Sequence, residues 1–220
     1  MRYSRIMNTQ PLVIDVISDV ICPWCFLGKR RLDAAIALVP EADVTVRWRP
    51  FFLDASIPAE GLDRRDYMLK KFGAERLKTI HDPLVAAGLA DGVPYAFDKI
   101  TRTPNTLNAH RVIRWAGEAG RQQVVVEALF MAYWHAGLDI GDTATLVDVA
   151  DANGMNRKRV KTDLASDRDK LEVFAEVQQA QSMGVSGVPT FVMAQRFGVS
   201  GAQSAALLAD GIRRAMGKQQ

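Results

Sequence analysis

The 220-residue sequence has few cysteines, few histidines and no long apolar run. Its two cysteines cannot supply the disulfide framework that stabilises small secreted domains. No stretch reaches the roughly 18 consecutive apolar residues that a membrane-spanning helix needs, so we expect no membrane partner. Lys and Arg number 28 against 25 Asp and Glu, an excess too small to indicate nucleic-acid binding. What remains is an ordinary globular composition, with 48% hydrophobic residues.

The first ten residues, MRYSRIMNTQ, are polar and lack the apolar core of a secretory signal. We interpret residues 1–10 as a flexible leader and expect the protein in the cytoplasm. Thiols are usually kept reduced there, so a close cysteine pair is more often catalytic or metal-binding than structural.

Three patterns at the start of the chain predict a strand, a helix and a second strand. The run PLVIDVIS at 11–18 is rich in Val and Ile, as buried strands are. From 22 to 39 the apolar residues follow a helical spacing, which Pro40 ends. The run VTVRWRPFF at 44–52 alternates between apolar and polar residues and ends as a strand near Pro50.

The middle of the chain consists mostly of helical patterns separated by Gly and Pro. Asp142 is expected to begin one helix, and Gly73, Gly88 and Gly154 are expected to end others. The expected helices span 63–72, 74–87, 104–117, 121–136, 142–152, 156–165 and 168–183.

The end of the chain predicts two strands and a helix. The runs TFVM and FGVS, within 188–201, are joined tightly at Ala194–Arg196, which indicates a hairpin. An amphipathic helix is expected to follow at 202–217.

This order of elements indicates an α/β domain, strand-helix-strand plus strand-strand-helix, interrupted by a large all-helical insertion. We assign residues 11–59 and 184–220 to the two halves of the domain, and residues 60–183 to the insertion.

Both cysteines lie in the motif CPWC, at the junction of the first strand and the first helix. The unpaired amides and the dipole of a helix N-terminus stabilise a thiolate, so the pKa of Cys22 is expected to fall. Cys25 lies one turn further along and is placed to resolve a mixed disulfide formed on Cys22. Pro23 costs no hydrogen bond in the first turn, and Trp24 offers a flat apolar face to a partner.

A metal site and an inert pair are the alternatives to redox chemistry. A structural zinc needs four ligands, and the chain has no second cysteine pair. His81, His110 and His135 lie far apart in sequence and would have to converge by folding. We therefore favour a redox pair without a metal.

Several motifs together resemble the DsbA-type branch of the thioredoxin superfamily, over nearly the whole chain after residue 10. They are CPWCFLGKRRL at 22–32, GVSGVPTFV at 184–192, WRPFFLD at 48–54 and TPNTLNAHR at 103–111. The sequence is most similar to the cytoplasmic FrnE-like group, whose members include proteins linked to polyketide biosynthesis.

The resemblance implies a thioredoxin fold and a role for each motif residue. Cys22 would attack disulfides, Cys25 would resolve the mixed disulfide, and Pro189 would follow a cis peptide bond and face the pair. We also expect Pro23, Trp24 and Val188 to bind the substrate, with Pro189 shaping the groove for the partner sulfur.

Two positions depart from the pattern of the family. Trp24 occupies the place of a histidine that helps to hold the thiolate in periplasmic relatives, so we expect a less oxidising disulfide. Val16 occupies the place of an acid that is common in thioredoxin relatives. Asp19 is a candidate substitute as proton acceptor, and the alternative is a loop or capping acid.

Three further residues are candidate substrate contacts. Asn105 and His110 lie in a stretch that resembles one near the active site of glutathione-dependent relatives. Arg49 is a candidate contact for an anionic substrate such as glutathione. The alternative roles are a helix start for Asn105, a packing histidine for His110 and an exposed strand position for Arg49.

The sequence thus predicts a thiol–disulfide oxidoreductase that acts through a mixed disulfide on a protein or a small molecule. No cofactor is required, and glutathione or thioredoxin is the expected redox partner. A glutathione-dependent isomerase or kappa-type glutathione transferase is one alternative, although kappa enzymes commonly use serine at the place of Cys22 and lack the second thiol. A holdase-like binding protein with a vestigial pair is another.

Overall fold

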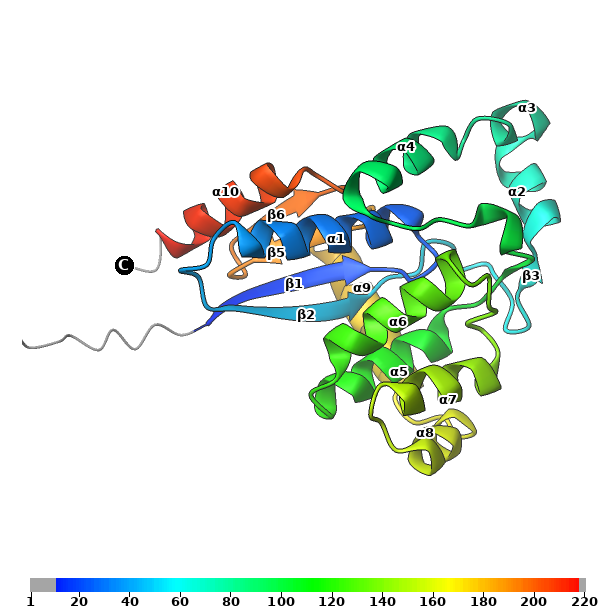
Figure 1. Cartoon of the computed structure of the whole chain (residues 1–220). Coiled ribbons are helices and arrows are strands. Elements are labelled where there is room, and N and C mark those ends of the chain that lie inside the picture. Colours follow the sequence, from blue (N-terminus) through cyan, green and yellow to red (C-terminus); the bar gives the residue numbers. More distant parts are fainter. Residues whose placement is uncertain (1–10, 218–220) are drawn as a thin grey trace, which may run out of the picture.

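A four-stranded mixed sheet forms the centre of the molecule (Figure 1). The computed structural model describes residues 11–217, so the leader expected at 1–10 lies outside the described residues. Strand β1 is central, parallel to β2 and antiparallel to β5, which pairs with β6 in turn. The strands are β1 (Leu12–Ser18), β2 (Val44–Pro50), β5 (Thr190–Met193) and β6 (Phe197–Ser200).

Both faces of the sheet are covered, which explains why β1 has an almost continuous apolar sequence. Leu12, Ile14 and Val16 face the main core, whereas Ile17 belongs to a second, smaller cluster on the other face. Helices α1 (Pro23–Ala37) and α10 (Ala205–Met216) lie side by side on the first face. Helix α9 (Lys170–Ser182) packs behind β2 on the opposite face.

The predicted hairpin is confirmed. Ala194 and Gln195 have φ values of 51° and 55° between β5 and β6. Two consecutive positive φ angles are typical of the type I′ turn, whose twist matches that of the paired strands. The predicted final helix is also confirmed, and Ser204 caps it by accepting a hydrogen bond from the Leu207 amide.

The segment between β2 and β5 contains residues 60–183, where the insertion is expected, and its regular structure is helical apart from one short antiparallel pairing of β3 with β4. Its helices surround the end of the sheet that carries the CPWC motif (Figure 1). Besides α9, its elements are β3 (Leu62–Asp63), α2 (Arg64–Phe72), α3 (Ala74–Leu77), α4 (Asp82–Asp91), the 3₁₀ helix η1 (Phe97–Lys99), β4 (Arg102–Thr103), α5 (Leu107–Glu118), α6 (Gln122–Trp134), α7 (Thr143–Ala152) and α8 (Arg157–Leu164).

One predicted helix, at 74–87, was wrong. It consists of two helices, α3 and α4, because Pro83 occupies the first turn of a new helix rather than the interior of a long one. Gly88 was also wrongly expected to end a helix. It lies inside α4, where an added Cβ would stand 2.8 Å from the Tyr95 ring, so packing rather than chain reversal requires glycine. Gly92, with φ of 67°, ends α4 instead.

The other proposed cap and stop residues are confirmed. The Asp142 side chain caps α7 by accepting from the Thr145 amide, and Gly73 and Gly154 follow helices with positive φ. Within residues 11–217, no helix is both long enough and apolar enough to span a bilayer.

Aromatic packing joins the insertion to the sheet domain in one core. Phe26 of α1 is fully buried, stacks on Phe130 of α6 at 5.2 Å and meets the edge of Tyr95 at 6.0 Å between ring centroids. Trp48 of β2 contacts the same Phe130 ring at 6.1 Å. Because α1 carries the cysteine motif at its start, this packing also determines where that motif lies.

We expect Phe26→Ala to lower the free energy of unfolding by about 3–5 kcal/mol, since it leaves a cavity between α1 and α6. The matched change Phe174→Ala, at a side chain that is 46% exposed, should cost about 1 kcal/mol or less. Urea unfolding at equilibrium measures both. Equal losses in the two variants would show that α1 is not held by this aromatic contact.

Candidate active site

The two cysteines lie at the first turn of α1, where β1 ends. Cys22 is the N-cap residue, with extended backbone angles (φ −91°, ψ 114°), and its amide donates to the Asp19 carbonyl at 3.0 Å. The Cys25 amide donates to the Cys22 carbonyl, also at 3.0 Å. The two cysteines are free, approach each other to 3.6 Å and are in hydrogen-bonding contact.

The two thiols have different surroundings. Cys22 is 3% exposed and lines a cavity, whereas Cys25 is fully buried beneath it. Burial, together with the hydrogen bond and charge of Cys22, raises the pKa of the Cys25 thiol well above its ordinary value. The nearby Ser18 hydroxyl and the Asp19 backbone lower the pKa of Cys25, and they offset only part of this effect. Cys25 therefore stays protonated near neutral pH.

The Val188–Pro189 turn faces Cys22 from the strand side. The peptide bond between them is cis, which confirms the expectation from the motif. The Cys22 Sγ lies 3.6 Å from the Val188 carbonyl oxygen. Helix α1 approaches the turn so closely that a Cβ on Gly28 would stand 2.8 Å from the Pro189 Cγ. This contact holds the turn against the first two turns of α1.

Residues of the insertion hold the motif from the opposite side. The Tyr95 hydroxyl donates to the Pro23 carbonyl at 2.6 Å, and the Trp134 indole N–H donates to the Val20 carbonyl at 3.0 Å. Neither role was predicted from the sequence, because each pair is separated by 72 or more positions. A pattern of spacings contains no information about such contacts.

A cavity of about 630 Å³ opens in front of Cys22. Cys22, Pro23, Trp24 and Val188 all line it, so the structure brings these four predicted residues together. The far wall comes from α2, α3 and α4, whose contribution the sequence analysis missed. The lining residues of this wall and the turns beside it include Arg64, Tyr67, Met68, Lys71, Phe72, Arg76, Ile80, His81 and Leu84.

Asp19 and His110 form a buried pair behind the cysteine loop. The His110 Nε2 donates to the Phe51 carbonyl at 3.0 Å and lies 3.4 Å from the Asp19 Oδ1. The other carboxylate oxygen of Asp19 accepts from the Leu53 amide at 2.8 Å. The contact with Cys25 comes from the main chain of Asp19 rather than from its carboxylate. The pair thus ties the chain after β1 to the chain after β2.

Asn105 lies away from the cysteines. Its side-chain amide donates to the Ile57 carbonyl at 2.8 Å, and its oxygen accepts from the Leu107 amide at 3.0 Å. Both polar groups are thus engaged with the backbone at the start of α5, and Asn105 does not line the cavity in front of Cys22.

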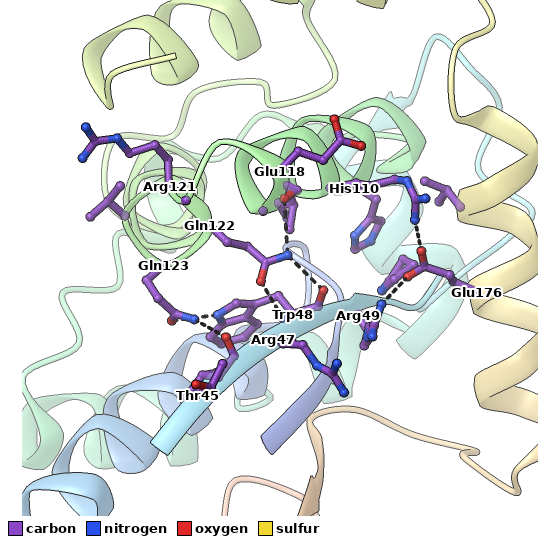
Figure 2. Close-up of a pocket in the computed structure, with 18 residues that line it drawn as sticks. Thr45, Arg47, Trp48, Arg49, His110, Glu118, Arg121, Gln122, Gln123 and Glu176 are labelled. Atoms are coloured by element: carbon purple, nitrogen blue, oxygen red, sulfur yellow. Dashed lines mark hydrogen bonds and ion pairs between the residues drawn. The ribbon is translucent and has the colours of Figure 1, made fainter. Parts of the chain in front are cut away.

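Arg49 belongs to a second cavity, of about 550 Å³, between β2 and helices α5, α6 and α9. Figure 2 shows its guanidinium directed at Glu176 of α9, with the His110 ring in the same cavity. Arg49 also pairs with Asp15 at 2.9 Å, and Arg47 binds the same carboxylate. The structure therefore places Arg49 in a network of ion pairs and not beside the thiols.

Two glutamines close the free edge of β2 in this second cavity. The Gln122 side chain accepts from the Trp48 amide at 3.0 Å and donates to the Trp48 carbonyl at 3.3 Å (Figure 2). Gln123 donates to the Val46 carbonyl and accepts from the Trp48 indole, both at 2.9 Å. These bonds satisfy backbone groups that an edge strand otherwise presents to other chains.

In the part of the chain that the structure describes, no group of three or more His, Cys, Asp and Glu side chains is placed to hold a metal ion.

Comparisons with known proteins agree with this architecture. A probable DsbA oxidoreductase of Streptomyces coelicolor is 29% identical, with a TM-score of 0.88 over 95% of this chain and 92% of that one. The cytosolic disulfide reductase DsbM of Pseudomonas aeruginosa, in a structure with GSH, has the same fold at 18% identity, with a TM-score of 0.64 over 94% and 98% of the chains. The uncharacterized protein YwbO of Bacillus subtilis is 28% identical over 186 residues, which cover 82% of this chain and 86% of YwbO.

The model of the DSBA-like thioredoxin domain matches residues 13–213, from the first strand through the last helix. With the cysteine pair at the start of α1 and the cis-proline turn against it, this match shows that the chain belongs to the DSBA-like thioredoxin domain family.

Proposed function

We propose that the protein is a thiol–disulfide oxidoreductase in which Cys22 is the nucleophile and Cys25 the resolving thiol. The observation that carries the proposal is the asymmetry of the pair. Cys22 lines a cavity beside the Val188 carbonyl, whereas Cys25 is fully buried with a raised pKa. One thiol is therefore placed to meet a partner and the other to act only within the protein.

The reaction follows from this arrangement in two exchanges. The Cys22 thiolate attacks one sulfur of a substrate disulfide, which breaks the S–S bond and releases the other sulfur as a thiolate. Cys25 then attacks the Cys22 sulfur of the mixed disulfide and releases the second substrate thiolate. The two protons carried by the reduced pair go to the released thiolates. The substrate is reduced by two electrons, and the Cys22–Cys25 disulfide holds the oxidised state.

The pKa of Cys25 is expected to respond to the first exchange. Two of the causes that raise it are the hydrogen bond with Cys22 and the charge of Cys22. Both disappear once the Cys22 sulfur is bonded to a partner sulfur, which leaves only burial opposing ionisation. Cys25 thus becomes the better nucleophile at the moment when it is needed. The nearby Ser18 hydroxyl lowers the pKa of Cys25 and so favours the thiolate that forms.

We assign Asp19 and His110 a positioning role. The carboxylate of Asp19 is engaged by the Leu53 amide and by His110, so its position does not favour direct proton transfer from Cys25. The substrate groove is assigned to Pro23, Trp24 and Val188, with Pro189 shaping the turn that presents Val188. Because Trp24 stands where periplasmic relatives carry a histidine, the disulfide is expected to be less oxidising than theirs.

The proposed setting is the cytoplasm, with glutathione or thioredoxin as redox partner, and the proposed subgroup is the FrnE-like one with its links to polyketide biosynthesis. A fold shared with a protein named a cytosolic disulfide reductase, in a structure with GSH, supports the setting. A glutathione-dependent isomerase, a kappa-type transferase or a holdase has no need for Cys25. The position of Cys25 directly behind Cys22 favours the oxidoreductase over these alternatives.

We expect limiting iodoacetamide near neutral pH to label Cys22 in preference to Cys25 in the reduced protein. Burial raises the pKa of Cys25, and only a thiolate reacts at an appreciable rate. Peptide mapping by mass spectrometry identifies the adduct. In Cys22→Ser, labelling of Cys25 should remain slow near neutral pH and accelerate only under alkaline conditions. Preferential labelling of Cys25 in the unmodified sequence would reverse the assigned roles.

We expect Cys22→Ser to abolish reduction of insulin and of small disulfides alike. Cys25→Ser should instead accumulate a mixed disulfide on Cys22, because the thiol that releases the partner is missing. Non-reducing mass spectrometry detects this adduct, and reduction with dithiothreitol should remove it. Full activity of Cys22→Ser would disprove the proposed function.

A further inference from the structure

The cavity in front of Cys22 has a one-sided charge. Three cationic side chains line it, Arg64, Lys71 and Arg76, and among residues 11–217 no Asp or Glu lines it. Lys71 has a carboxylate partner outside the lining, since its Nζ lies 3.1 Å from an oxygen of Asp54. The wall therefore carries a net positive charge, and Arg64 and Arg76 are the cations on it that have no carboxylate partner among the described residues.

Those two arginines are held by aromatic groups instead of carboxylates. The Arg64 guanidinium lies 5.7 Å from the Trp134 ring centroid and contacts the Tyr133 hydroxyl at 3.4 Å. The Arg76 guanidinium lies 5.6 Å from the Phe72 ring centroid. A guanidinium over a ring keeps its donors free for a ligand, because the ring occupies only one face.

His81 adds a neutral polar group to the same wall. It stacks on Phe97 at 3.9 Å between ring centroids, and its buried Nε2 has no hydrogen-bond partner among the residues that the structure describes. Burial and the nearby charge of Arg64 lower the pKa of His81, so the ring is neutral near pH 7. A buried polar atom without a partner is costly, and a ligand that enters the cavity can satisfy it.

The rest of the lining is apolar, and the thiol is recessed. Its apolar residues include Ile21, Trp24, Met68, Phe72, Ile80 and Leu84. A volume of about 630 Å³ lies within the range of small-molecule sites, roughly 300–1,000 Å³. Cys22 is only 3% exposed, beneath the helices of the insertion. This recess favours a small or flexible molecule over a disulfide that is held in a rigid folded protein.

We infer from these observations that the substrate is a low-molecular-weight disulfide with an apolar body and a carboxylate or similar anionic group. This inference adds a substrate class to the proposed function and rests on it. Arg64 and Arg76 bind the anion, and the apolar wall takes the body. One substrate sulfur then lies against Cys22. Two-electron reduction yields two small thiols and the Cys22–Cys25 disulfide, as in the balanced exchange above.

The test compares single-turnover oxidation of the reduced protein by two aromatic disulfides. Dithiobis(nitrobenzoate) is a dianion and dithiodipyridine is neutral, and both release thiols that absorb light. Each rate is divided by the rate of the same disulfide with dithiothreitol, which corrects for intrinsic reactivity. The site variant is Arg64→Gln with Arg76→Gln. The control variant is Arg65→Gln with Lys70→Gln, which removes two charges from exposed positions of α2 that do not line the cavity.

We expect the corrected rate of the site variant with the dianion to fall about fivefold to tenfold. This is the loss expected when two partly exposed charge pairs between protein and ligand are removed. Its rate with the neutral disulfide should stay within about twofold, which also shows that the variant is folded, and the control variant should keep both rates.

An equal loss in the control would show general attraction by the surface, and no loss in the site variant would show that the arginines do not bind the anion. Either result overturns the inference while the oxidoreductase assignment stands. Failure of both disulfides to oxidise the unmodified protein would instead disprove the proposed function itself.

Discussion

The first turn of α1 is held from two sides, and the chemistry of the protein depends on this constraint. On one side the Val188–Pro189 turn packs against Gly28 and brings the Val188 carbonyl to 3.6 Å from the Cys22 sulfur. On the other side Tyr95 and Trp134 bind the carbonyls of Pro23 and Val20. The CPWC loop therefore has little freedom to move relative to either the sheet or the insertion.

This confinement makes two chemically similar residues different. Cys25 faces the core and loses all contact with water, so its neutral form is favoured. Cys22 precedes the first helical residue and faces a cavity, where the amides of the helix start are available. The same backbone turn thus gives the two thiols different surroundings, and the roles proposed for them rest on burial and not on residue type.

The insertion contributes more than a cover to the sheet domain. Its α6 supplies the aromatic surface on which Phe26 packs, and its α2 supplies cationic and aromatic side chains to the cavity. An acid–histidine pair, Asp19 with His110, connects the insertion to the loop before Cys22. The insertion thus lines the cavity in front of Cys22, whereas the sheet domain provides the cysteine pair.

Local features of this protein follow from short stretches of its sequence. The apolar run of β1, the Asp142 cap, the β5–β6 hairpin and the position of Cys22 at a helix start depend on neighbouring residues, and the structure confirms them. The motif resemblance added the fold and the cis bond before Pro189. Where a local pattern had two physical causes, as at Gly88, the sequence did not distinguish tight packing from the end of a helix.

Which distant residues meet depends on how the whole chain folds. Asn105 and Arg49 have polar groups that could bind a substrate. In the folded protein, however, Asn105 is hydrogen-bonded to backbone carbonyl and amide groups, and Arg49 forms ion pairs behind the sheet. Arg64 and Arg76, ordinary surface cations in the sequence, line the cavity of the thiol. Spacing along the chain reports on neighbours within a helix or a strand, whereas these contacts depend on how whole helices pack.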